Sequence, residues 1–168
     1  NAEKSRTLEP GCDRFDVCVP AGETDRVFLY EIYKDEAAFA DHLTEMLKFQ
    51  HPDVVHAHFW MSGWASARAA RRLNLPLLVT FHALGSVKRR YQGPADTSPL
   101  NRIRVEVAVA GAADSIVATA TEEVRELALL GVPGSKVSVV PCSVDLEHFT
   151  PASTPNAFLL PTMMSNFA

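Results

Sequence analysis

Histidine and basic side chains recur at three places in the second half of the sequence. His56 and His58 stand two residues apart, His82 follows an apolar run, and residues 88–90 are Lys-Arg-Arg. An imidazole can hydrogen-bond to reacting groups and exchange a proton near neutral pH, and basic side chains bind anions such as phosphate. The plainer alternatives are a histidine packed against a loop at a strand end and a solvated basic loop.

Metal binding is not the chemistry that these residues predict. His56 and His58 share one side of a predicted strand, because side chains two residues apart lie on one face, but no third ligand is nearby. The cysteines, at positions 12, 18 and 142, lack metal-ligand spacing and leave an odd thiol. This cysteine use fits a reducing compartment, and we expect a cytoplasmic protein without a bound metal.

Strands and helices that could position these side chains alternate in the second half of the chain. Apolar runs predict four strands, at residues 53–59, 77–81, 115–118 and 136–140. With helices between the strands, this order predicts a doubly wound α/β domain with a parallel sheet. Ligands of such sheets bind beyond the carboxyl ends of the strands, here at residues 56–58, 82–90, 119–122 and 141–148.

Local signals set the expected starts of the three helices between these strands. Ser62 is the expected N-cap of the first helix, and Ser98-Pro99 is the expected start of the second, after a loop at 82–97. Thr119 and Glu122 have the spacing of a capping box before the third helix. Helical spacing predicts that the second helix buries Ile103, Val107 and Ala110.

The first 50 residues predict a different arrangement. Alternation at 13–19 and β-branched and aromatic residues at 27–33, joined by turn residues, predict an antiparallel hairpin. Asp35 is expected to cap the helix that follows, and residues 1–9 suit the end of an earlier helix. Helix, strand, strand and helix make half of a ferredoxin-like α+β unit.

The amino-acid sequence of this first segment resembles that of a known family. SRTLEPGCDRFDV, followed by RVFLYEIYKDEAAFADHL, resembles the antibiotic biosynthesis monooxygenase (ABM) family over residues 1–46. The resemblance implies a small dimeric α+β barrel, with cofactor-independent oxygenases and isomerases among its members. It places His42 where such proteins often have a helix histidine, which is otherwise a surface residue.

Four longer motifs in the second half resemble another family. They are PDVVHAHFWMSGWAS, TFHALGSVKRR, RIRVEVAVAGAADSIVATATEEVRELALLGVP and KVSVVPCSVDLEHFTP, in this order. Over residues 51–151 they resemble the N-terminal, acceptor-side domain of retaining GT-B glycosyltransferases of family 4, such as sucrose-phosphate synthases and inositol-phosphate glycosyltransferases. The resemblance implies a Rossmann-like domain and hexosyl transfer to a sugar or sugar-phosphate acceptor. It implies no cofactor, since the nucleotide-diphosphate sugar is the donor substrate.

The resemblance also implies roles for individual residues. His82, in its Thr-x-His context, would point into the cleft near the transferred sugar and position the reacting groups as the catalytic histidine. Lys88 and Arg89, on the loop that follows, would help to hold a phosphorylated acceptor. His58 would border the acceptor pocket.

Arg102 has two interpretations. In the resemblance it reaches the acceptor phosphate, whereas its spacing alone predicts a surface ion pair with Glu106 at i,i+4. Phe59 and Ala83 stand where relatives with phosphorylated acceptors often carry hydroxyl groups. These two departures count against a sugar-phosphate acceptor.

The organisation of the whole chain predicts two partial domains joined near residues 47–52, at 1–46 and 51–151, with an unassigned tail at 152–168. Residues 1–50 hold 6 Lys or Arg against 11 Asp or Glu, and the remainder hold 10 against 9. The hairpin is expected to pair with an exposed edge of the α/β sheet or to form a homodimer. We expect no nucleic-acid partner at a net charge of −4 and no transmembrane segment.

The donor-side domain of the glycosyltransferase resemblance finds no counterpart in these 168 residues. We therefore expect the chain alone to have little or no transferase activity. Two other functions remain open at this stage. One is an ABM-like monooxygenase or isomerase fragment, with a pocket near Phe15, Tyr30 and His42, and the other is a non-catalytic interaction module.

Overall fold

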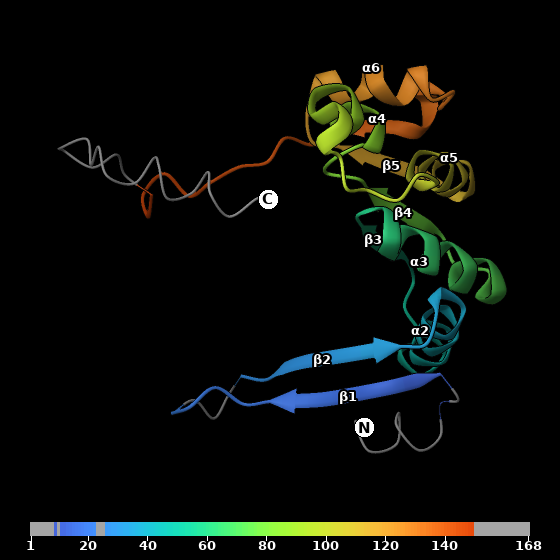
Figure 1. Cartoon of the computed structure of the whole chain (residues 1–168), viewed down its shortest axis with the longest axis vertical. Helices are drawn as coiled ribbons and strands as arrows, with labels where there is room; N and C mark the ends of the chain where they lie inside the picture. The colour runs from blue at the N-terminus through green and yellow to red at the C-terminus, as the bar shows by residue number, and fades with distance from the viewer. Residues whose placement is uncertain (1–8, 10, 23–25, 150–168) are drawn as a thin grey trace.

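The computed structural model describes residues 9, 11–22 and 26–149. Figure 1 shows a two-stranded hairpin at one end, a larger body built on a four-stranded sheet, and helix α2 between them. The tail predicted at 152–168 lies outside the described residues, as does the helix end predicted within residues 1–9, except Glu9.

The hairpin forms as the sequence predicts. Strands β1 (Cys12–Cys18) and β2 (Phe28–Tyr33) pair antiparallel. Helix α2 (Glu36–Gln50) follows, and the Asp35 side chain accepts a hydrogen bond of 2.8 Å from the Ala38 N–H, so Asp35 is the N-cap. The expected pairing of the hairpin with an edge of the other sheet is wrong. The two sheets are separate, because α2 follows the hairpin directly and packs against helix α3 (Trp60–Leu73).

The hairpin leaves many apolar side chains in contact with solvent. Phe28, Leu29 and Tyr30 on β2 are each more than half exposed, as is Val27 just before the strand. The homodimer expected through this hairpin stays a prediction.

The larger body contains the predicted parallel sheet. Its strands are β3 (Val55–His58), β4 (Leu77–Thr80), β5 (Ser115–Ala118) and β6 (Val137–Val139). They lie in the order β3-β4-β5-β6, and every neighbouring pair is parallel.

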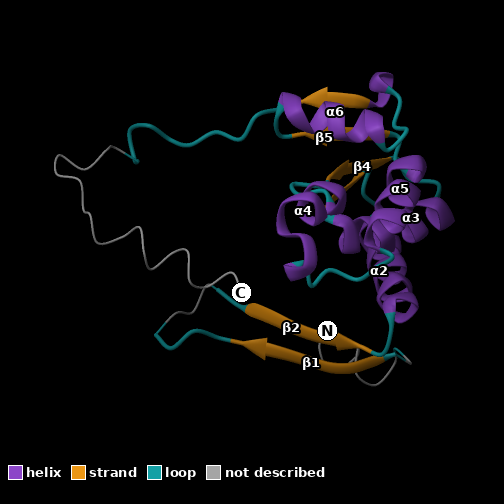
Figure 2. Ribbon diagram, turned by 45° about the horizontal axis from the view of Figure 1, so that its top comes forward, coloured by secondary structure: helices purple, strands orange, loops and turns teal. Residues whose placement is uncertain are grey.

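The expectation of a doubly wound sheet is wrong for the described strands, because such a sheet requires a reversal of strand order. Right-handed crossovers that all step one way put their helices on one face. Accordingly, α3 packs against α5 (Arg102–Ala112), as Figure 2 shows.

All three predicted helix starts shift in the structure, that of α5 as described below, and the predicted loop contains a further helix. Helix α3 begins at Trp60, two residues before Ser62, after Phe59 with a positive φ of 72°. The loop predicted at 82–97 contains helix α4 (Gly85–Gln92) and a 3₁₀ turn, η1 (Gly93–Ala95). Helix α6 (Thr121–Leu129) is preceded by a side-chain bond from Thr119 to Glu123 rather than to the expected Glu122.

Helix α5 differs most from its sequence-based prediction. It begins at Arg102 instead of Ser98-Pro99, and Val107 of the predicted buried stripe is 40% exposed. Arg102 and Glu106 are buried in its place, together with Val109 and Ala110. The helix is rotated because it buries an ion pair at its first turn, which apolar periodicity alone cannot reveal.

Small residues allow α3 and α5 to approach each other over β4. A side chain at Gly63 on α3 would lie 2.8 Å from Cγ1 of Val109 on α5 and 3.8 Å from Cγ1 of Val79 on β4. Both valines are almost completely buried and stiff at χ1. None of the helices in the part of the chain that the structure describes has the length and apolar character needed to cross a bilayer.

We predict that Gly63→Ala lowers the free energy of unfolding by about 1–3 kcal/mol, because the new methyl group overpacks this contact. Gly111→Ala is the matched control, since Gly111 also lies in a helix but faces open space. It should stabilise the chain by up to about 1 kcal/mol. Urea unfolding of both variants measures the difference, and equal effects would contradict the close packing of α3 on α5.

Candidate functional site

Two histidines meet at the carboxyl ends of neighbouring strands. His58 is the last residue of β3 and lies opposite Thr80 of β4, and His82 follows β4 by two residues. The Nδ1 atom of His58 lies 2.8 Å from Nε2 of His82, and the two rings stack with centroids 5.1 Å apart. The distance fits one hydrogen bond, with one imidazole donating and the other accepting.

The backbone at His82 helps to hold this arrangement. His82 has a φ of 61°, and the Ala83 N–H donates to the Phe81 carbonyl across it at 2.7 Å. This is a tight three-residue turn that a residue other than glycine adopts at a cost. Strained backbone of this kind concentrates at functional sites, where the surrounding structure holds it.

His56 extends the pair into a cluster of three imidazoles. Its Nε2 lies 2.8 Å from Oγ1 of Thr80, and its ring centroid is 4.2 Å from that of His58. Partial burial and then the nearby imidazoles of His58 and His82 lower the pKa of His56 below its usual value. In the described part of the chain, no three His, Cys, Asp or Glu side chains are placed to hold a metal ion.

A cavity of about 620 Å³ opens beside His82. Helices α4 and α6 form its walls, and Arg90 of α4 reaches Glu126 of α6 through two bonds of 2.6 and 3.3 Å. The lining residues are His82, Ala83, Leu84, Val87, Lys88, Arg90, Tyr91, Gln92, Thr119, Ala120, Glu122, Glu123 and Glu126. The structure thus brings the predicted His82 and Lys88 to one cavity.

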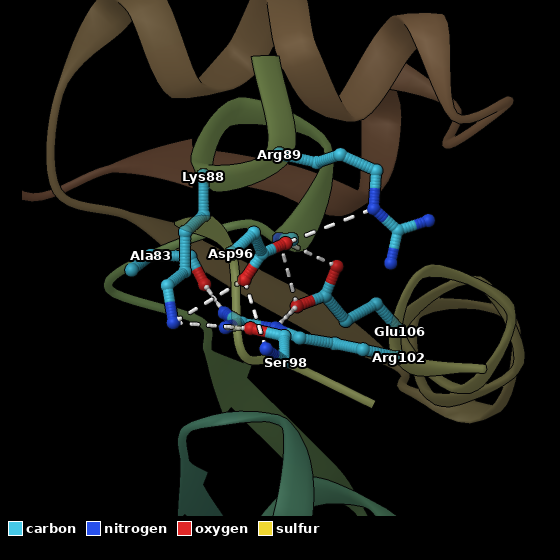
Figure 3. Close-up of polar contacts among 8 residues, drawn as sticks. Ala83, Lys88, Arg89, Asp96, Ser98, Arg102 and Glu106 are labelled. Atoms are coloured by element: carbon cyan, nitrogen blue, oxygen red, sulfur yellow. Dashed lines mark hydrogen bonds and ion pairs between the residues drawn. The ribbon is translucent and has the colours of Figure 1, made fainter. Parts of the chain in front are cut away.

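Lys88 and Arg89 are both engaged by one carboxylate that sequence reasoning missed (Figure 3). Lys88 Nζ lies 3.4 Å from Oδ1 of Asp96, and Arg89 Nε lies 3.7 Å from Oδ2. Hydrogen bonds from the Ser98 backbone and hydroxyl, together with Lys88, lower the pKa of Asp96 to about 2. The sequence ADTSP carries a signal for this role, because Asp two residues before Ser commonly accepts the backbone N–H across a turn, here at 2.9 Å.

Arg102 lies behind the cavity rather than in its wall. Its side chain is 4% exposed and pairs with Glu106 at 2.8 Å, so the i,i+4 pair is present but buried, not on the surface. Its guanidinium also donates to the Ala83 carbonyl at 2.6 Å and to the Ser98 hydroxyl at 3.2 Å. Figure 3 shows this group beneath the chain that follows His82. Contact with an acceptor phosphate stays a prediction, and the geometry gives Arg102 a positioning role.

Glu106 also holds the chain that follows His82. Both of its carboxylate oxygens accept the Gly85 N–H, at 3.0 and 2.9 Å, at the start of α4. An alanine at position 85 would put its Cβ 3.0 Å from the Arg102 side chain and would crowd it. Together, Arg102 and Glu106 hold residues 83–85 from α5.

A second, smaller cavity of about 400 Å³ lies between the hairpin and α2. Cys12, Tyr33 and His42 line it, and His42 Nδ1 lies 2.6 Å from a carboxylate oxygen of Glu9. The Tyr33 hydroxyl donates to Glu31 at 2.8 Å, and burial together with this carboxylate raises the pKa of Tyr33. Phe15 and Tyr30 do not line the cavity. The oxygenase or isomerase alternative stays a prediction.

Comparison with known proteins relates the chain to a family of glycosyltransferases. The model of Glycosyltransferase Family 4 matches residues 5–148. The D-inositol 3-phosphate glycosyltransferase of Xylanimonas cellulosilytica is 42% identical over 101 residues, which are 59% of this chain and 24% of that protein. The enzyme of the same name from Nocardiopsis dassonvillei is 34% identical over 151 residues, 83% of this chain and 34% of that protein.

A solved structure shows the same fold. The sucrose-phosphate synthase of Thermosynechococcus elongatus superposes with a TM-score of 0.61 at 25% identity, covering 69% of this chain and 29% of that one. The chain thus spans about a quarter to a third of the length of these relatives. The match to Glycosyltransferase Family 4 begins at residue 5, so it includes most of the segment at 1–46 that resembles the ABM family. None of these comparisons supports the resemblance to the ABM family.

We predict that Glu106→Gln lowers the free energy of unfolding by about 3–5 kcal/mol, because it leaves the buried Arg102 without a counter-charge. Asp16→Asn is the control, since it breaks the exposed pair of Asp16 with Arg14 and should cost at most about 1 kcal/mol. The double variant Arg102→Met, Glu106→Leu should recover part of the loss. Urea unfolding measures all three, and a cost for Glu106→Gln as small as the control would contradict the bracing role.

We predict that His56 titrates below 6.5, its ordinary pKa. The unfolded chain then takes up this proton before the folded chain does, so stability should fall as the pH decreases below about 6.5. His56→Gln keeps a donor near Thr80 and should remove this part of the loss. NMR titration of the imidazole and urea unfolding between about pH 7 and pH 5 check both statements. A His56 that titrates above 6.5 would contradict them.

Proposed function

We propose that this chain, which belongs to glycosyltransferase family 4, binds the acceptor of a sugar-transfer reaction in the cavity beside His82. The observation that carries the proposal is the His58–His82 pair at the carboxyl ends of β3 and β4. His82 lines the cavity, whereas His58 does not line it and contacts it only through His82. In open α/β sheets this end of the strands is the ligand side. The family match covers both strands and the cavity lining.

The proposed reaction is a retaining transfer of a hexosyl group from a nucleotide-diphosphate sugar to an acceptor hydroxyl. The bond between the anomeric carbon and the diphosphate oxygen breaks, and a bond from that carbon to the acceptor oxygen forms. The proton of the acceptor hydroxyl passes to the departing nucleotide diphosphate. His82 would hydrogen-bond to the reacting groups, and His58 would hold the His82 ring in position through the 2.8 Å contact. No metal or further cofactor belongs to this proposal.

The surrounding residues have supporting roles in the proposal. Arg102 and Glu106 hold the chain at Ala83 and Gly85, next to His82, and so fix the direction of its imidazole. Lys88 lies on the cavity wall, and Arg89 lies behind it with Asp96. We assign no residue of the described chain to the sugar donor, and the transfer step itself is part of the proposal.

We predict that sugars or sugar phosphates shift the backbone amide NMR signals of residues 82–91 and that His82→Asn weakens this binding about fivefold. The loss corresponds to one hydrogen bond of about 1 kcal/mol. Asparagine is chosen because it tolerates the positive φ of His82. His51→Asn is the matched control, because His51 is an exposed histidine with a φ of 49° at the end of α2. If no compound in a panel of hexoses, polyols and their phosphates moves these signals, the proposed function is wrong.

A further inference from the structure

We propose that the acceptor held in the cavity beside His82 is a neutral sugar or polyol, not a phosphate ester. This inference rests on the proposed function and names the substrate class of the same site. It follows from the ion pairs that the basic side chains around the cavity already form. Lys88, Arg89, Arg90 and Arg102 each already have an acidic partner within the chain.

Of these ion pairs, the one between Lys88 and Asp96 most limits the freedom of a basic side chain to bind a ligand. The Asp96 side chain is 4% exposed and receives the Ser98 N–H at 2.9 Å and Lys88 at 3.4 Å. Lys88 also donates to the Ser98 hydroxyl at 3.1 Å, so two groups hold its ammonium in place. A phosphate that recruited Lys88 would remove one of the groups that stabilise the Asp96 carboxylate, which is an electrostatic cost.

Arg90 is held on the opposite side of the cavity. Its two terminal nitrogens contact the two carboxylate oxygens of Glu126, at 2.6 and 3.3 Å. This is the fork geometry by which arginine also binds phosphate, so Glu126 occupies the position that a phosphate would take. Arg102 is buried against Glu106 and the Ala83 carbonyl, so it has no face directed at the cavity.

The remaining charges of the lining also oppose an anion. Two cationic side chains, Lys88 and Arg90, face three anionic ones, Glu122, Glu123 and Glu126. A phosphate monoester carries a charge of about −1.5 to −2 at neutral pH and would be repelled by this surplus of carboxylates. Hydroxyl groups of a neutral sugar, in contrast, can donate to carboxylate oxygens and share hydrogen bonds with His82.

The test compares matched pairs of compounds on the 168-residue chain. The pairs are glucose with glucose 6-phosphate and myo-inositol with D-myo-inositol 3-phosphate, followed through the amide signals of residues 82–91. We expect the neutral member of at least one pair to bind more tightly than its phosphate. Asp96→Asn frees Lys88 and Arg89 and keeps an acceptor for the Ser98 N–H, so it should raise phosphate affinity at least about tenfold, or about 1.4 kcal/mol. It should leave the neutral affinity within a factor of about two.

A charge control makes the result specific. Asp16→Asn makes the same change of charge on the exposed hairpin and should alter neither affinity. Lys88→Met is measured with the two phosphates and should not weaken them, because in this proposal Lys88 serves Asp96 and not a phosphate.

The outcomes separate the two proposals. If the phosphates bind more tightly than their neutral partners and Lys88→Met weakens them, the inference is overturned while the proposed function stands. If none of the four compounds moves the signals of residues 82–91, both are overturned for these acceptors. Tighter neutral binding that Asp96→Asn reverses supports the inference.

Discussion

The buried ion pair between Arg102 and Glu106 is the contact on which the rest of the site depends. It joins the first turn of α5 to the Ala83 carbonyl and the Gly85 N–H, two atoms of the chain that directly follows His82. The Arg102 guanidinium also lies over the Phe59 ring at 5.1 Å, so the same group touches the connection that follows β3. One charged group therefore sets the positions of both strand-to-helix connections. Burying this charge is tolerated because each of the three guanidinium nitrogens donates a hydrogen bond, one of them to the Glu106 carboxylate.

The two connections share a backbone feature that follows from this constraint. Phe59, after β3, has a φ of 72°, and His82, after β4, has a φ of 61°. The Phe59 N–H donates to the Thr80 carbonyl at 2.8 Å, so the end of β3 is tied to the end of β4 at this point. Because both chains leave adjacent parallel strands through a left-handed residue, the imidazoles of His58 and His82 come to stack. The strain at these positions is the cost of the alignment, and the Arg102–Glu106 pair is what holds it.

The sequence predicts the strands and the hairpin because both rest on local patterns. Val27 to Tyr33 is rich in β-branched and aromatic residues, Leu77 to Phe81 is a continuous apolar or β-branched run, and both regions form strands. It fails at helix α4, since Gly85 to Gln92 is polar and glycine-led, and its start depends on an N–H bond to Glu106, 21 residues away. The same long-range contact rotates α5, so the residue that periodicity placed in the core, Val107, faces solvent.

The candidate site shows the same division between local and long-range information. His82 and Lys88, which residue type and position at a strand end single out in the sequence, both line the cavity, while their roles there stay predictions. Whether a basic run is available to a ligand is decided by its partners. The partners of Lys88 and Arg90 lie 8 and 36 residues further along the chain. Basic residues at a strand end predict phosphate binding only where no carboxylate of the fold reaches them first. Here Asp96 and Glu126 do reach them, so Lys88 and Arg90 are paired within the chain, and this pairing is the reason for proposing an uncharged acceptor.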